Sequence, residues 1–127
     1  MQATYVRGAA AYRQTSVQSS SPLGLVVMLY DGALRHLLAA RDASARGDAR
    51  GRRDGLSKAM AIVAELQSTL NIAEGGEIAS SLDSLYTYVM ERLVAAGTSG
   101  DVRPIEEAEH LLRPLREAWS EISAGSR

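Results

Sequence analysis

The segment that decides the fold is SSPLGLVVMLYDGALRHLLAARDA, residues 20–43. Ser21 and Pro22 predict a helix start, because a serine hydroxyl can accept a hydrogen bond from a first-turn N–H and proline has no N–H to leave unpaired. At 100° per residue, the apolar side chains that follow cover an arc of about 240°, whereas an ordinary surface helix needs roughly 100°. Only a narrow strip near Asp31, Arg35 and Asp42 is polar. This helix, predicted over residues 21–47, must therefore be covered on several sides.

The composition narrows the class of protein. The chain has 127 residues, the length of one domain. A net charge of −1 gives no strong field toward nucleic acid or anionic lipid, and the longest unbroken apolar run, residues 25–30, is too short to cross a membrane. Cysteine is absent, which removes disulfides and thiolate sites. We therefore expect a cytoplasmic protein with no nucleic-acid partner and no membrane insertion.

Two helices are predicted next along the chain, over residues 48–72 and 77–97. Gly47 marks a turn, and Asp48 is placed to cap the first of them. The segment NIAEGG, residues 71–76, interrupts the apolar pattern between the two helices, and Gly97 is expected to end the second as a left-handed cap. The stripes predicted to face the core are Leu56, Met60, Val63, Leu66 and Leu70 in the first helix and Ile78, Leu82, Leu85, Val89 and Ala96 in the second.

The last predicted helix covers residues 104–123 and has the strictest apolar repeat, from Ile105 to Ile122. Pro114 lies inside it and removes one backbone hydrogen bond, so we expect a kink between residues 110 and 114. Four helices with short connections predict an all-α, antiparallel four-helix bundle over residues 21–123. Residues 1–20 are polar and small and form an N-terminal arm, mobile or docked, while residues 124–127 form a frayed tail.

The chain offers few groups for catalysis. Glu107 and His110 have the i, i+3 spacing of di-iron bundles, but such a site needs a second pair, and nothing near His36, the other histidine, supplies it. The GGEI segment at Gly75 has no P-loop lysine. We therefore expect no catalytic residue, no metal site and no cofactor. A metal-dependent bundle enzyme is the least favoured hypothesis.

Four blocks of this sequence together resemble the FliS family of flagellin-specific export chaperones. They are AYRQTSV at residues 11–17, the helical segment quoted above, residues 56–96 with their GGEIA and SLYTYVMERL elements, and residues 105–122 with their EAW ending. The resemblance implies a cytoplasmic bundle that binds the C-terminal segment of flagellin, keeps it from polymerising, and delivers it to a component of the flagellar type III export gate. A helix-in-groove mode would suit a client of this kind.

The resemblance also implies a role for the arm. Family members are similar in using a tyrosine there, and it matches Tyr12, so Tyr12 and Val17 are expected to dock the arm on the bundle. Three positions differ from the family pattern: Ala9 replaces a second tyrosine, Gly24 replaces a capping residue, and Pro114 interrupts the last helix.

Client contacts are predicted where apolar surface exceeds what the core needs. Tyrosines are favoured because the ring covers apolar surface while the hydroxyl prefers a wet edge. Asp31 either binds client backbone or faces solvent. The predicted client-binding residues on the bundle are Tyr30, Asp31, Leu34, Leu38, Tyr86, Tyr88, Met90 and Val94. The alternative reading is a structural or regulatory module that covers the same surface by self-association, for example as a homodimer.

Overall fold

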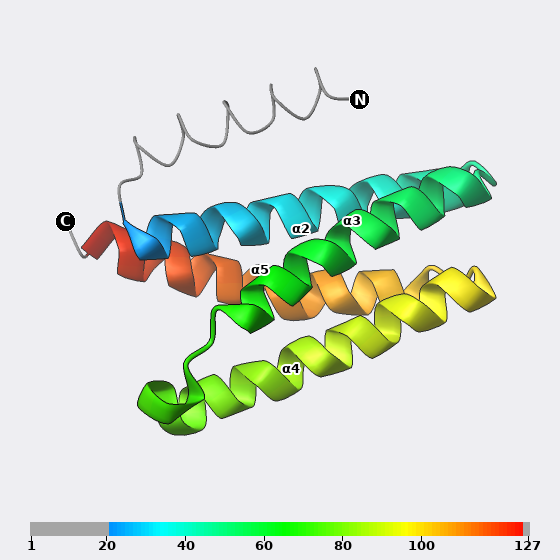
Figure 1. Ribbon diagram of the computed structural model, residues 1–127. Helices are drawn as coiled ribbons and strands as arrows, with labels where there is room; N and C mark the ends of the chain where they lie inside the picture. The colour runs from blue at the N-terminus through cyan, green and yellow to red at the C-terminus, as the bar shows by residue number, and fades with distance from the viewer. Residues whose placement is uncertain (1–20, 126–127) are drawn as a thin grey trace, which may run out of the picture.

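The computed structural model describes residues 21–125 and forms four α-helices in that range, with no strand there. They are α2 (Pro22–Ala45), α3 (Ala49–Ser68), α4 (Ile72–Ser99) and α5 (Arg103–Gly125). The helices alternate in direction, and α3 and α5 each lie between α2 and α4 (Figure 1). The prediction of an all-α four-helix bundle is confirmed. The arm, with Tyr12 and Val17, lies outside the described residues.

Side-chain caps start the first two helices as predicted. The Ser21 hydroxyl accepts a hydrogen bond from the Gly24 N–H at 2.9 Å. The Asp48 carboxylate does the same for the Gly51 N–H at 2.9 Å, directly after Gly47, whose φ of 73° makes the turn. Each cap satisfies a backbone N–H that the helix itself leaves free, which contributes about 1 kcal/mol to helix stability.

The third helix differs from the prediction at both ends. α4 begins at Ile72, capped by Asn71, and Gly76 interrupts its helical backbone with φ 56° and ψ −131°, so regular helix resumes at residue 77. The prediction that Gly97 is the left-handed cap is wrong, because the helix continues to Ser99 and Gly100, with φ 77°, ends it. Pro114 does not interrupt α5, which continues to Gly125.

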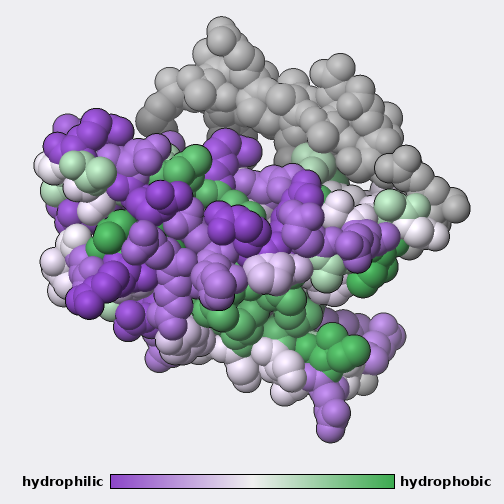
Figure 2. Space-filling model, turned by 180° about the vertical axis from the view of Figure 1, so that it is seen from behind, coloured by the Kyte–Doolittle hydropathy of each residue, from purple (hydrophilic) through white to green (hydrophobic). Residues whose placement is uncertain are grey.

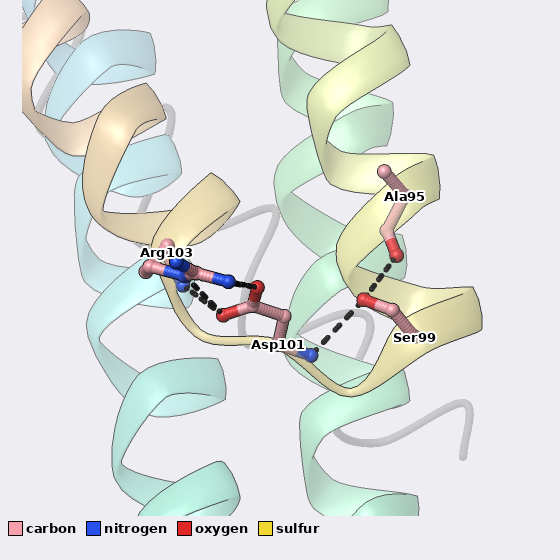
Figure 3. A network of polar contacts seen from close by, with 4 residues as sticks. All are labelled: Ala95, Ser99, Asp101 and Arg103. Atoms are coloured by element: carbon pink, nitrogen blue, oxygen red, sulfur yellow. Dashed lines mark hydrogen bonds and ion pairs between the residues drawn. The ribbon is translucent and has the colours of Figure 1, made fainter.

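The turn between α4 and α5 is held by a short polar network (Figure 3). The Ser99 hydroxyl donates to the Ala95 carbonyl at 2.9 Å and accepts from the Asp101 N–H at 3.1 Å. Asp101 then accepts from the Arg103 guanidinium at 2.7 Å and from the Arg103 backbone N–H at 3.0 Å. These bonds from Arg103 lower the pKa of Asp101 from 3.8 to about 2.

This shift predicts an acid-dependent loss of stability. Because the pKa of Asp101 is lower in the folded chain, its stabilising effect is complete above the ordinary value and is lost as the pH falls from about 4 toward 2. In the Asp101→Asn variant, the melting temperature should fall less over this pH interval than in the wild type. Parallel losses of melting temperature in both proteins would contradict the prediction.

One end of the bundle is closely packed, the end that holds the α2–α3 and α4–α5 turns. A Cβ added to Gly55 of α3 would lie 2.9 Å from the His36 carbonyl oxygen and 3.0 Å from the Ala40 Cβ of α2, so the two backbones touch there. Leu37, Leu93 and Ile105 are fully buried near the same end. Small residues thus let α2 and α3 approach closely, and large aliphatic side chains fill the space between them and the other two helices.

The opposite end, which we call the open end, holds the start of α2, the end of α3, the start of α4 and the end of α5. Figure 1 shows α4 diverging from α5 toward this end. Ile78, predicted as a core residue, is 72% exposed, and Ile122 on α5 is 51% exposed. Those two core predictions are wrong, because the apolar stripes of α4 and α5 continue past the point where the helices stay in contact.

α2 has the length and apolar composition of a membrane-spanning helix, and it is the one helix of the described residues that does. The expectation of no membrane insertion used the longest unbroken apolar run, residues 25–30, whereas the helix as a whole has 24 residues. In the bundle α2 packs between α3 and α5, and its Tyr30, Ala33, Leu37 and Ala40 are fully buried. Within the apolar stretch 33% is buried in the bundle, so a place in the core accounts for only part of the composition of α2.

Candidate functional site: an apolar cleft at the open end

The open end contains a cleft of about 400 Å³ lined mainly by apolar side chains. All four helices contribute to it, which is why no single stripe of the sequence reveals it. Its size and apolar lining are those of a ligand or peptide site. The lining residues are Leu23 and Val26 of α2, Leu66 of α3 with Thr69, Leu70 and Asn71 of the following turn, Glu74, Gly75, Ile78, Ala79, Leu82 and Tyr86 of α4, and Trp119 of α5.

The first turns of α2, which border the cleft, are less buried than the rest of the helix. Every residue from 23 to 29 is only half-buried, although most are Leu, Val or Met, and full burial on α2 starts at Tyr30. On the face seen in Figure 2, hydrophobic side chains gather in a band across the lower half of the molecule, whereas the left part of this face is mostly hydrophilic. An exposed apolar area of this kind marks a binding surface.

Tyr30 and Tyr86 meet in the core beside the cleft. Their hydroxyl oxygens are 2.6 Å apart, and the ring centroids are 6.4 Å apart with planes tilted by 57°. The pair joins α2 to α4 across the bundle, where the two backbones make no close approach. Both side chains are at most 2% exposed, and burial raises the pKa of both hydroxyls. The expectation that they face a wet edge is therefore wrong.

The α3–α4 wall of the cleft is fixed by one amide. Gln67 Nε2 donates to the Asp83 carboxylate and to the Thr87 hydroxyl, both at 2.9 Å. These bonds join the last turns of α3 to the middle of α4, next to Leu66 and Tyr86 in the lining. The amide thus keeps the two helices in register at the point where the cleft begins.

The other predicted client residues lie outside the cleft. Leu34 and Leu38 continue the side of α2 that faces α5, and Leu38 is 44% exposed. Val94 lines a smaller groove between α3 and α4, at the closely packed half of the bundle, and is 54% exposed, while Met90 is half-buried against the core. Only Tyr86 among the eight bundle residues predicted lines the cleft.

Asp31 has a partner that the sequence did not suggest. Its carboxylate accepts from Arg116 Nε at 2.7 Å and from Arg116 Nη2 at 3.3 Å, and this pair joins α2 to α5. Glu109 lies about two helical turns before Arg116 on α5. It is only 4% exposed and accepts two hydrogen bonds from Arg41 of α2. In both pairs the guanidinium donates two hydrogen bonds to one carboxylate, which fixes the geometry of the pair. The face between α2 and α5 is thus joined by two ion pairs.

Tyr88 is 41% exposed and donates to Glu107 at 2.7 Å, while Arg92 donates to the same carboxylate at 2.7 Å. These bonds join α4 to α5 and lower the pKa of Glu107. The carboxylate that would form the Glu-x-x-His ligand pair is therefore engaged. Among residues 21–125 no three His, Cys, Asp or Glu side chains come together in a way that could hold a metal ion.

The sequence did not predict the cleft, although several of its apolar residues were predicted to lie in the core or to contact the client. Periodicity alone predicted that Leu66, Leu70, Ile78 and Leu82 belong to the core. A signal was present in residues 71–76, where NIAEGG breaks the pattern just before Ile78. Because Gly76 adopts a backbone conformation that favours glycine, it changes the direction of the chain at the point where α4 leaves the bundle.

The fold is an all-α bundle, and its open end holds an apolar cleft of the size of a ligand or peptide site, which is typical of a helical binding protein. The sequence profile described as flagellar protein FliS matches residues 5–126. The chain is 42% identical over 121 residues to the flagellar secretion chaperone FliS of Salmonella typhimurium, covering 91% of this chain and 90% of the relative. The chain therefore belongs to the FliS family.

Two further relatives agree with this assignment. The flagellar secretion chaperone FliS of Escherichia coli is 35% identical over 120 residues, covering 91% of this chain and 88% of the relative. The protein of the same name in Bacillus subtilis is 33% identical over 117 residues, covering 92% and 86%. All three relatives are named as chaperones, which is not a class of enzyme.

Proposed function

We propose that this chain is a cytoplasmic export chaperone that binds the C-terminal segment of flagellin, prevents its premature polymerisation, and delivers it to the flagellar export gate. Membership of the FliS family supports flagellin as the client. The cleft at the open end supports the mode of binding, since it offers apolar surface from four helices to one amphipathic segment. The protein acts by binding alone and needs no cofactor.

Release follows from how such a client binds. A flagellin segment that is unfolded when free must become ordered in the cleft, and this ordering uses part of the free energy gained by burying apolar surface. The affinity is thus lower than the buried area suggests. A chaperone that passes its client to an export gate requires this property.

The experiment that tests the function is isothermal titration of the chain with full-length flagellin and with flagellin lacking its last segment of about 40 residues, roughly three helices of average length. One-to-one binding that is lost on truncation, with a negative heat-capacity change, is expected because the client buries apolar surface. Equal binding to both proteins would overturn the proposal.

Docking of the arm on the bundle through Tyr12 and Val17 is part of the same proposal. Tyr88, Leu38 and Val94 are candidate contacts for a client that extends beyond the cleft. Self-association is the competing use of the same apolar surface. Sedimentation of the purified chain separates the two, because a monomer that assembles only with flagellin fits the chaperone and a stable dimer without client fits the alternative.

A further inference from the structure

The first turn of α4, residues 72–75, is separated from the rest of the helix by a bend, and in Figure 1 the chain makes this turn before the long part of α4 begins. The bend lies at Gly76, whose φ is 56° and ψ −131°. The turn is capped locally, since the Asn71 side chain accepts from the Glu74 N–H at 3.2 Å. Among the described residues, no hydrogen bond or ion pair joins residues 71–76 to another helix. The turn can thus change its orientation at Gly76 without breaking such a bond.

Two adjacent glycines permit the bend. Gly76 has a positive φ, which glycine adopts readily and alanine does not. A Cβ added to Gly75 would lie only 2.6 Å from the Ala79 Cβ, which is too close for two carbon atoms that are not bonded. In a continuous helix, Cβ atoms four residues apart lie about 5 to 6 Å from each other, so the first turn is folded back on α4. In a continuous helix, neither position would require glycine.

A continuous α4 would place Ile72 on the face of the helix that lines the cleft. Residues at intervals of seven lie on one face of a helix. The residues at this interval in α4 are Ile72, Ala79, Tyr86 and Leu93. Ala79 and Tyr86 line the cleft, and Leu93 is fully buried. In the bent form, however, Ile72 lies outside the cleft lining and is 51% exposed.

The same change would remove a carboxylate from the edge of the cleft. Glu74 lines the cleft in the bent form. At intervals of seven it shares a helix face with Ser81 and Tyr88, which are both exposed. In a continuous α4, Glu74 would therefore face solvent while Ile72 extended the apolar lining. An amphipathic segment gains apolar contact in the continuous form, and a ligand shifts a protein toward the form with which it makes better contacts.

We propose that the first turn of α4 is a hinged flap, which is bent at Gly76 in the free chain and becomes continuous with α4 when the client segment occupies the cleft. Ile72 then contacts the client. This inference rests on the proposed function and adds a conformational step to it. The free energy used to straighten the turn lowers the affinity for the client, which favours release.

Three alanine variants of the full chain test the hinge. Gly75→Ala and Gly76→Ala disfavour the bent form for different reasons, a side-chain clash and a positive φ. In titrations with full-length flagellin, each should bind about 3- to 10-fold more tightly than the wild type, because more of the free chain is already in the binding form. Gly100→Ala is the matched control, since it also places alanine at a positive φ but at the other end of α4. It should leave the affinity unchanged. If Gly75→Ala and Gly76→Ala bind no more tightly than the wild type, the proposal is overturned.

A second pair of variants tests the contact of Ile72. Ile72→Ser should weaken flagellin binding about 3- to 10-fold, because the exposed half of the side chain becomes buried against the client. Ile122→Ser is the matched control, since Ile122 is also 51% exposed and also lies outside the cleft lining. Its effect should be much smaller. Equal effects of the two substitutions would contradict the predicted contact.

Amide hydrogen exchange in the free chain separates the hinge from the proposed function. In a continuous helix, the N–H groups of residues 77 and 78 donate to the carbonyls of residues 73 and 74, across Gly76. Gly75→Ala and Gly76→Ala should therefore slow exchange at residues 77 and 78 relative to the wild type. If exchange is unchanged while the wild-type chain binds flagellin, the hinge fails and the proposed function stands. If the wild-type chain does not bind flagellin, the proposed function fails, and the role of Ile72 fails with it.

Discussion

Replacing Gly55 with valine is expected to lower the free energy of unfolding by about 2 to 4 kcal/mol, a large part of the stability of a domain of this size. The first added carbon would lie 2.9 Å from the backbone oxygen of His36 and 3.0 Å from the backbone nitrogen of Ala40. Both are backbone atoms, so neither can move away by a change of side-chain rotamer. α3 must therefore move away from α2, and the buried contacts between the two helices loosen.

Urea unfolding measured by circular dichroism would test this prediction. Gly97→Ala is the matched control, because Gly97 also lies inside a helix and an added Cβ would meet only Leu56 Cδ1, at 3.8 Å. That variant should be more stable than the wild type by up to about 1 kcal/mol, the difference in helix propensity between alanine and glycine. A Gly55→Val protein that unfolds at the wild-type urea concentration would show that the close approach of α2 and α3 is not needed.

The sequence was sufficient to predict the bundle because its signals are local. Ser21 and Asp48 cap the helices that they were expected to cap. On α3, the predicted stripe residues Leu56, Val63 and Leu66 are buried. Helix ends that depend on backbone dihedral angles were harder to place. Gly97 was predicted as the left-handed cap of the third helix, but the positive φ of such a cap occurs three residues later, at Gly100.

The cleft could not be predicted because periodicity shows that a face is apolar but not what covers it. Ile78 and Val89 belong to one stripe of α4, yet Val89 is fully buried and Ile78 is 72% exposed. The difference arises from the divergence of α4 and α5 toward the open end, which is a property of the tertiary structure. The pairing of Tyr30 with Tyr86 also could not be predicted from periodicity, because the two hydroxyls that share a hydrogen bond lie 56 positions apart in the sequence.

The variant with the largest expected effect on binding is Ile78→Asp. Because Ile78 is 72% exposed in the free chain, the substitution should leave the fold intact. In the complex proposed above, the same side chain would be buried against the client, and full burial of an isoleucine contributes about 1.5 to 3 kcal/mol. An aspartate there adds the cost of removing a charge from water. We expect flagellin affinity to fall about 100-fold or more.

Val94→Asp is the matched comparison, because it places the same charge at a half-exposed aliphatic residue of the same helix. Val94 lines the groove between α3 and α4 and not the cleft. If the client binds mainly at the open end, Val94→Asp should weaken flagellin binding far less than Ile78→Asp, with equal helical content in both variants. The reverse order would place the main client contact in the α3–α4 groove, because a buried charge is most costly where the client covers it most completely.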